Sequence, residues 1–347
     1  MRFYTGQHRY YCGIDLHART MYLCILEHGS GDVLLHRNLR CEPRLFLRAI
    51  EPYRDDLVVA AECIFCWYWL ADLCTREHIP FVLGHALYMK AIHGGKAKND
   101  RIDSRKIAVL LRGGAIPIAY VYPQGMRATR DLLRRRLFFV RKRSELFSHL
   151  RITFHQLNLP APPARLLDRR NRAGVADAIP DPVVRASVEA DLAMAAGLDV
   201  VIRFVEQAIE RQAGTEDPDT LELLQTIPGV GPILSRTLLY ELHDVARFPR
   251  VQDFLSYARL VKCQKGSAGK VLGTSGAKIG NAHLKWAFSE AAVGFLQRNP
   301  SGHKLIQRLR SKHGKGKALS ILAARLGRAS YYMLRRSTPF DMDRFMN

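Results

Sequence analysis

The sequence predicts an α/β domain followed by a mostly helical region, and two patterns support this fold class. Over the first hundred residues, short apolar runs bounded by turn-forming residues alternate with segments of helical apolar spacing. From residue 126 onward the apolar spacing is mainly helical. The chain has 347 residues, of which 48% are hydrophobic. These values predict a globular protein of more than one domain and exclude a disordered or collagen-like chain.

Three strands open the predicted α/β domain, at residues 10–15, 22–26 and 33–36. The short turn-like segments between them favour antiparallel pairing. Helix and strand then alternate, with helices over 42–51 and 67–77, strands over 57–61 and 81–83, and a last helix beyond Asn99. The predicted order is therefore β-β-β-α-β-α-β-α.

A long basic helix is predicted over residues 126–156, where no proline or glycine interrupts the pattern. A proline-rich break follows at 159–163, and a second helix runs from Pro182 to about residue 212. Such an antiparallel pair fits a solvated or dimerising spacer, or a coiled coil that contacts nucleic acid. The consecutive cations Arg134, Arg135 and Arg136 favour the nucleic-acid interpretation.

The last part of the chain begins with two helices around the turn Ile-Pro-Gly-Val-Gly-Pro at residues 227–232. Gly229 and Gly231 would let backbone N–H groups approach a phosphate, although a helix-to-helix turn needs glycines for conformational reasons as well. Helices are predicted over most of 249–333, with loops at 264–281 and 311–317. We therefore predict three parts, at residues 1–125, 126–215 and 216–347.

The charge of the chain points to a polyanionic partner. Lys and Arg number 53 against 32 Asp and Glu, which gives a net charge of +21. Such an excess favours nucleic acid as the partner. No apolar run is long enough for a membrane span, and the N-terminus lacks the pattern of a signal peptide, so we expect a cytoplasmic protein. The seven cysteines include Cys63 and Cys66, which have no further ligands at zinc-site spacing and are expected to be reduced thiols.

Four acidic residues follow the predicted strands or open the predicted helix of the first part. Asp15 ends the first strand and Glu62 follows the strand over 57–61, whereas Asp100 and Asp103 share one face of the helix beyond Asn99. Each alone is explained by a strand end or a helix cap. Together they predict a site for one or two divalent cations, Mg²⁺ or alternatively Mn²⁺, of the kind that supports phosphoryl transfer.

These motifs resemble a known family over nearly the whole chain. Gly13-Ile14-Asp15, Ala61-Glu62 and the segment 99–103 are similar to the four-acid pattern of a RuvC-like domain with a ribonuclease-H fold. The Pro-Gly-Val-Gly turn and the segments 267–270 and 273–281 resemble the second domain of the DEDD transposases of insertion sequence family 110. Residues 63–66 and Ser104 depart from the family pattern beside the acids.

The resemblance implies a bacterial, nucleoid-associated recombinase that moves its own insertion element. Its partners would be donor and target DNA, a structured guide (bridge) RNA, and further copies of itself in a dimer or tetramer. The resemblance assigns the metal to Asp15, Glu62, Asp100 and Asp103, and the nucleophile to Ser267. It also implies composite sites, with the acids of one subunit and the serine of another.

The residues around Ser267 suit a bound phosphate. Lys262, Lys265 and Lys270 supply cations, and glycines beside the serine allow a close approach of the backbone to DNA. Ser275 and Lys278 extend this segment as phosphate-binding residues, and the sequence leaves open whether Ser267 and Ser275 exchange roles. Two other functions remain open, namely a metal-dependent nuclease of the Holliday-junction type and a non-catalytic RNA- or DNA-binding protein.

Overall fold

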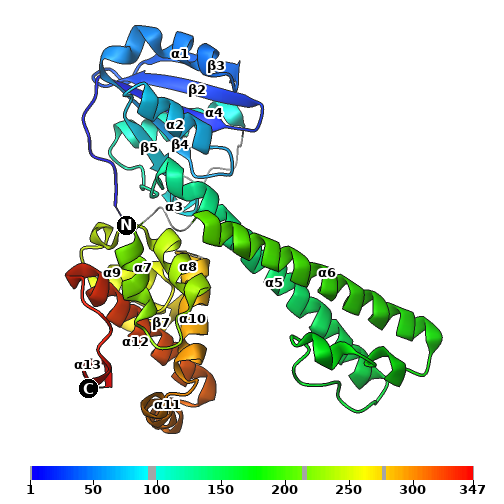
Figure 1. The fold of residues 1–347 in the computed structure, drawn as a ribbon. Helices are drawn as coiled ribbons and strands as arrows, with labels where there is room; N and C mark the ends of the chain where they lie inside the picture. Colours follow the sequence, from blue (N-terminus) through cyan, green and yellow to red (C-terminus); the bar gives the residue numbers. More distant parts are fainter. Residues whose placement is uncertain (1, 93–98, 213–216, 276–278, 347) are drawn as a thin grey trace. The chain divides into compact units, whose positions relative to one another are not determined.

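The computed structural model describes residues 2–92, 99–212, 217–275 and 279–346. The chain forms two compact units, Met1–Gln124 and Gly125–Asn347 (Figure 1). In the first unit the predicted order β-β-β-α-β-α-β-α is confirmed, with two further short helices, a 3-10 helix (Glu51–Asp56) before the fourth strand and an α-helix (Ala86–Ile92) before the last helix. Among the described residues, no helix combines the length and the hydropathy that a membrane span requires.

The first unit is built on one mixed sheet with the strand order β3-β2-β1-β4-β5. Strands β1, β2 and β3 are antiparallel, whereas β4 pairs in parallel with both β1 and β5. The strands are β1 (Tyr10–Leu16), β2 (Thr20–Glu27), β3 (Val33–Arg40), β4 (Leu57–Glu62) and β5 (Phe81–Gly84). The helices are α1 (Pro43–Ile50), α2 (Tyr68–Arg76), α3 (Ala86–Ile92) and α4 (Asp100–Arg112).

The two faces of this sheet are covered by different helices because side chains alternate along each strand. On one face, Cys12 and Ile14 of β1 pack in a core with Phe46 of α1 and Leu70 of α2. On the other face, Tyr11 joins a core that includes residues of α4. The central strand β1 is therefore buried on both sides, and only its end reaches the surface.

The second unit is almost entirely helical. Its helices are α5 (Gln124–Gln156), α6 (Pro182–Gln212), α7 (Pro218–Gln225), α8 (Pro232–Leu242), α9 (Val251–Tyr257), α10 (Ala282–Phe295), α11 (Pro300–His313), α12 (Lys315–Arg336) and α13 (Met342–Met346). The predicted loop over 311–317 is too long. Helices α11 and α12 are separated by the single residue Gly314, where φ is +78°. A glycine adopts that backbone conformation without steric cost.

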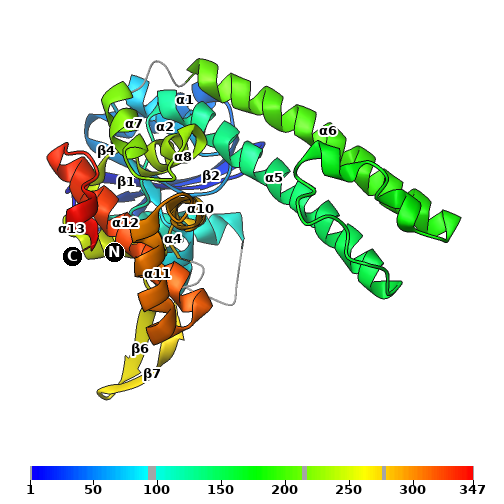
Figure 2. The same ribbon diagram turned by 60° about the horizontal axis from the view of Figure 1, so that its bottom comes forward.

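A β-hairpin occupies the segment that we predicted as a loop over 264–281. Strands β6 (Cys263–Ser267) and β7 (Lys270–Ser275) pair in antiparallel register, and the hairpin projects from the helices of its unit (Figure 2). The prediction failed because the segment is rich in glycine, serine and lysine and lacks the apolar alternation of a half-buried strand. Pairing between the two strands does not require that alternation when neither face is buried.

Helices α5 and α6 lie side by side as the predicted antiparallel pair (Figures 1 and 2). Near the base, Leu133 of α5 and Ile209 of α6 belong to the core that also contains α8, α10 and α12. Near the tip, Phe154 and Val188 belong to a separate small core. The base of the pair is therefore continuous with the C-terminal helices, and the separation of 126–215 from 216–347 remains a prediction.

A buried carboxylate fixes the base of α5 to the C-terminal helices. Glu241 of α8 is 1% exposed, and it accepts hydrogen bonds from Arg130 Nε at 3.0 Å, Arg134 Nη2 at 2.9 Å and Asn281 Nδ2 at 2.8 Å. Asn281 also caps α10 by accepting from the backbone N–H of His283 and Leu284. Burial by itself would raise the pKa of Glu241, but the two arginines and Asn281 outweigh it and lower the pKa.

We expect Glu241→Gln to lower the free energy of unfolding of the second unit by about 3–5 kcal/mol, because two arginines lose their buried counter-charge. Urea unfolding followed by circular dichroism measures this loss. Because the pKa of Glu241 is lowered in the folded state, its contribution is present above the ordinary value of 4.5 and is lost as the pH falls below it. The control is Glu206→Gln, which breaks a more exposed pair with Arg136 and should cost less than about 1 kcal/mol. Equal losses in both variants would contradict this account of Glu241.

Candidate active site

Gly13 allows α4 to cross β1 closely. A Cβ atom at this position would lie 2.2 Å from the backbone nitrogen of Ala108 and 2.4 Å from the carbonyl oxygen of Ser104, both in α4. Backbone atoms cannot yield to such overlap, so only glycine permits this approach. The glycine two residues before Asp15 therefore brings the start of α4 to the end of β1.

Of the four predicted acids, Asp15 and Asp100 come close enough together at that end of the sheet to share an ion, and Glu62 and Asp103 do not belong to that group. Ile14 of β1 is aligned with Ala61 of β4, so Asp15 and Glu62 follow at neighbouring positions of two parallel strands. Residues two before them, Gly13 and Ala60, belong to the face that α4 covers. Asp15 and Glu62 thus share the face toward α4, and the charges of Asp100 and Asp103 act on Asp15.

Helix α4 presents its two acids from its first turn. Asn99 caps this helix, with its Oδ1 accepting a hydrogen bond from the backbone N–H of Ile102 at 2.8 Å. Carboxylates are favoured at this position because the N-terminus of a helix carries a partial positive charge. Asp103 also forms an ion pair with Lys106, at 3.1 Å from its Nζ.

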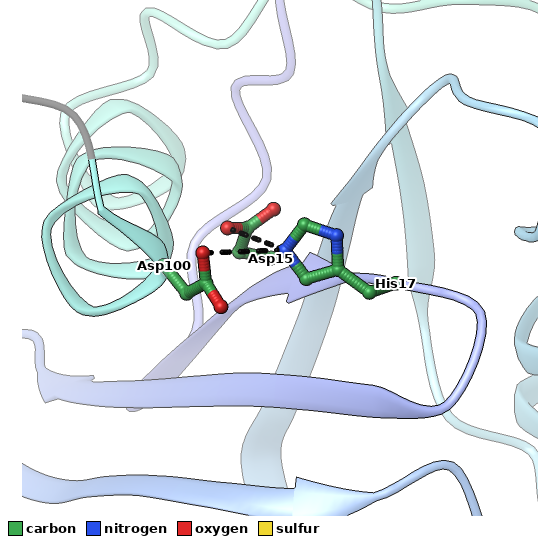
Figure 3. Close-up of side chains that lie close together, drawn as sticks. All are labelled: Asp15, His17 and Asp100. Atoms are coloured by element: carbon green, nitrogen blue, oxygen red, sulfur yellow. Dashed lines mark ion pairs between the residues drawn. The ribbon is translucent and has the colours of Figure 1, made fainter.

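His17 joins the acids, and the sequence analysis missed it. Its Nε2 lies 3.3 Å from Asp15 Oδ2 and 3.4 Å from Asp100 Oδ1 (Figure 3). One ligand atom from each of the three side chains lies within 4.8 Å of the others. The signal was present in the sequence, because residues two apart at a strand end point to the same face, as Asp15 and His17 do.

This donor set fits a hard divalent cation. The side chain of Asp15 is 14% exposed, whereas those of His17 and Asp100 are 48% and 53% exposed, so an ion would reach the site from solvent. Burial raises the pKa of the Asp15 carboxyl, His17 partly offsets this rise, and the charges of Asp100 and Asp103 add to it. A bound cation would relieve the repulsion among these carboxylates. Carboxylate oxygens are suitable ligands for both Mg²⁺ and Mn²⁺. The imidazole adds a nitrogen donor, which Mn²⁺ accepts more readily than Mg²⁺ does.

The two departures from the family pattern fit into this site without displacing the acids. Ser104 is buried, and its hydroxyl donates to the carbonyl oxygen of Arg101 at 3.0 Å. After Glu62, the backbone N–H of Cys63 bonds to the carbonyl of Gly84, and Cys66 Sγ lies 3.5 Å from the carbonyl oxygen of Leu16. Cys66 thus lies beside the end of β1. Burial is the main cause that raises the pKa of the Cys66 thiol, and the charge of Asp15 raises it further.

Ser267 lies at the tip of the β6–β7 hairpin and is exposed. It pairs with Lys270 across a two-residue turn in which Ala268 and Gly269 have φ values of +49° and +74°. Positive φ at both turn positions is typical of type I′ hairpins, which favour Asn, Asp or Gly at the first position. Alanine there is strained, and local strain of this kind is concentrated at functional sites.

The other residues predicted around this serine are placed only in part. Lys270 is exposed directly after the hairpin turn, whereas Lys262 is exposed before the start of β6, at the other end of that strand. Lys265 lies on β6 and Ser275 ends β7, but their side chains are outside the described part of the chain. Lys278 lies outside the described residues altogether. The roles expected of these residues remain predictions.

The predicted phosphate-binding turn is explained in part by packing. Gly229 has a φ of +84°, and a Cβ there would lie 2.2 Å from the carbonyl carbon of Gly294 in α10. This glycine is therefore needed for the contact between the turn and α10. Gly231 is exposed at the N-cap of α8, and a Cβ there would meet no atom within 4 Å, so the space beside it is open.

Two of the three consecutive arginines have internal partners. Arg134 bonds to the buried Glu241, and Arg136 bonds to Glu206 at 2.6 Å. Arg135 is exposed and lies over the ring of Phe138 at 4.9 Å. The sequence showed three consecutive cations but not their partners, because Glu241 lies in α8 and Glu206 lies in α6. Of the three, Arg135 is the one that is best placed to meet a phosphate.

Comparison with known proteins decides the family. Residues 12–158 match the IS110-type DEDD family described as Transposase, and residues 221–307 match the family described as Transposase IS116/IS110/IS902 family. The first match contains all four predicted acids, and the second contains Ser267. The chain belongs to the IS110 family of DEDD transposases. No curated protein matches the chain.

This IS110-family transposase is therefore an enzyme that acts on DNA, and its family implies the use of a divalent metal. The acids and His17 lie in the first unit of the transposase, and Ser267 lies in the second. The strongly basic composition agrees with a DNA substrate, because phosphate contacts by Lys and Arg supply most sequence-independent affinity.

Proposed function

We propose that this transposase moves its insertion element by site-specific recombination, guided by a structured RNA encoded beside it. The observation that carries its metal-dependent chemistry is the cluster of Asp15, His17 and Asp100 on the α4 face of a sheet with strand order β3-β2-β1-β4-β5, and the net charge of +21 supports a nucleic-acid partner. Three antiparallel strands followed by two parallel strands support a ribonuclease-H-like, RuvC-like fold for this unit. We further propose Glu62 of β4 and Asp103 of α4, which lie outside that cluster, as additional acids of the site.

The proposed cation is Mg²⁺, with Mn²⁺ as the alternative, held by Asp15, Glu62, Asp100 and Asp103. Such an ion stabilises negative charge that develops on phosphate oxygens. The partial burial of Asp15 excludes some of the competing water, and His17, 3.3 Å from Asp15 and 3.4 Å from Asp100, would add a nitrogen donor at the same site. Carboxylates on a strand and a helix are held in place by those elements, so no loop has to become ordered before the ion binds.

Ser267 is the proposed nucleophile. Its Oγ would form a bond to phosphorus while one ester bond between phosphorus and a deoxyribose oxygen breaks. The serine loses its proton and the released deoxyribose oxygen gains one, so a covalent phosphoserine keeps the energy of the original ester. Attack by a second DNA hydroxyl reverses these steps and restores the serine. The exposed position of Ser267 at a hairpin tip, opposite Lys270 in the strand register, supports this role.

A nuclease is the second candidate, because the cluster of Asp15, His17 and Asp100 lies in a unit that does not contain Ser267. In that case water attacks the phosphate and the serine only binds DNA. The two functions are separated by incubating the protein with its element ends, flanking RNA and Mg²⁺, and then denaturing the mixture. Radiolabelled DNA that migrates with the protein supports transposition through a phosphoserine. Cleaved DNA without any such adduct would establish the nuclease instead.

The RNA partner yields a prediction on affinity. Because the net charge is +21, we expect the purified protein to carry RNA, and its affinity for any nucleic acid to fall steeply with salt through counterion release. Filter binding over a salt series measures this slope. At a fixed salt concentration, RNA from beside the element should bind at least about tenfold more tightly than random RNA of equal length. Equal affinities would remove the basis for guidance by RNA.

A further inference from the structure

A histidine on the edge strand β3 is bonded to the helix that carries two of the acids. The Nε2 atom of His36 lies 2.9 Å from the carbonyl oxygen of Arg101, in the first turn of α4. A carbonyl oxygen only accepts hydrogen bonds, so Nε2 carries the hydrogen and is the donor. The same nitrogen lies 3.2 Å from the hydroxyl oxygen of Ser104. His36 therefore links an outer strand of the sheet to the start of α4.

The carbonyl that His36 binds lies between the two acids of α4. Arg101 directly follows Asp100 and precedes Asp103 by two residues. The buried Ser104 donates to the same carbonyl at 3.0 Å, so two side chains restrain one peptide of the first turn. A restraint on this peptide fixes the backbone from which both carboxylates project.

A contact between two rings connects His36 to the other part of the site. The ring centroids of Tyr22 and His36 are 5.1 Å apart, with an interplanar angle of 76°, and this edge-to-face arrangement is a favourable one. Tyr22 lies on β2 directly opposite Asp15 of β1, and paired side chains of two strands lie on the same face of a sheet. His36 thus contacts the neighbour of Asp15 through its ring and the start of α4 through Nε2.

Repulsion among the acids makes such a link necessary. Asp100 and Asp103 act on Asp15 with charges of the same sign. In the absence of a cation, this repulsion favours movement of the start of α4 away from the end of β1. A donor that binds the backbone of the first turn opposes the movement. It also leaves the carboxylate oxygens available to an ion, because it bonds to a peptide and not to a ligand atom.

We propose that His36 is a positioning residue of the metal site, which holds the first turn of α4 in place so that Asp100 and Asp15 can bind one ion together. The inference rests on the metal site of the proposed function and adds to it a residue that is not itself a ligand. Loss of a partner that orients metal ligands typically lowers the affinity for the metal by about 10–100-fold. The role of His36 is therefore measurable as an affinity, independently of cleavage.

The first test measures the binding of Mn²⁺ to the full chain. Nuclease treatment and chromatography at high salt first remove nucleic acid, because its phosphates would take up the ion. Electron paramagnetic resonance then measures free Mn²⁺ during a titration, and the relevant site is the one that Asp15→Asn removes. We expect His36→Ala to raise the dissociation constant of this site at least about tenfold.

Two further variants distinguish positioning from a general effect on β3. In His36→Gln the side-chain amide replaces Nε2 as the donor, so the affinity for Mn²⁺ should stay within about threefold of that of the unsubstituted protein. Asn38→Ala is the matched control, because Asn38 is exposed two residues further along the same face of β3, and it should bind Mn²⁺ normally. Equal affinities of His36→Ala and the unsubstituted protein, or an equal loss in Asn38→Ala, would overturn the role of His36 alone. Absence of any site that depends on Asp15 would remove the proposed metal site as well.

Hydrogen exchange without metal tests the cause of the loss. In His36→Ala, the amides in the first turn of α4 should exchange at least about fivefold faster, because that turn loses its attachment to β3. Exchange in β1 and β4 should not change. Unchanged exchange in the first turn would contradict the proposal, and faster exchange throughout the first unit would assign His36 a general structural role instead.

Discussion

Ser267→Ala is expected to abolish both the covalent protein–DNA adduct and recombination, with a loss of rate of about 10⁵–10⁶-fold, as for other nucleophilic serines. The fold should not change, because Ser267 is exposed at the end of β6 and its backbone pairing with Lys270 does not involve the hydroxyl. DNA affinity should stay within about threefold, because the exposed Lys262 and Lys270 remain. Denaturing electrophoresis with labelled DNA measures the adduct, and filter binding measures the affinity.

Ser275→Ala is the matched control for this prediction. It removes a hydroxyl from the other strand of the same hairpin, where we expect only a phosphate contact worth about 1–3 kcal/mol. An adduct that persists in Ser267→Ala and disappears in Ser275→Ala would transfer the role of nucleophile to Ser275. The comparison therefore decides between the two serines that the sequence analysis left open.

Asp15→Asn is expected to lower strand cleavage by about 100-fold or more at saturating Mg²⁺, because a central carboxylate ligand loses its charge. EDTA should abolish the activity of the unsubstituted protein, and added Mg²⁺ should restore it. The shape of the side chain is retained, so the fold should be kept. A cleavage assay on labelled element ends measures the loss.

Stability separates this effect from unfolding. The pKa of Asp15 is raised in the folded protein, so its ionised form opposes folding at neutral pH. Asp15→Asn should therefore leave the melting temperature unchanged or raise it. The matched control is Asp56→Asn in the same unit, where the carboxylate also pairs with a histidine, His8, at 2.8 Å. That variant should cleave normally, and full cleavage by Asp15→Asn would contradict the metal site.

The local pattern of the sequence determined most elements of the fold. Strands β1, β2 and β4 are apolar runs that end at turn residues, and the long helices α5 and α6 follow from uninterrupted helical spacing. The places of the four acids at strand ends and in the first turn of a helix were also predictable, because these are local features, and their shared role in one site remains a prediction. The hairpin around Ser267 was not predictable, because exposed strands leave no apolar alternation.

Tertiary structure decided which charges are available and which are held inside the protein. The sequence does not distinguish Arg134 from the two arginines that follow it. Only the folded chain brings Arg134 to Glu241, which is 107 residues away in the sequence. His17 became a member of the acidic site because the fold places the start of α4 beside the end of β1. Residues distant in sequence can be paired only when the packing of the helices is known. Sequence periodicity therefore specifies which residues form each helix and strand, whereas contacts between those elements decide which side chains can meet a metal or a phosphate.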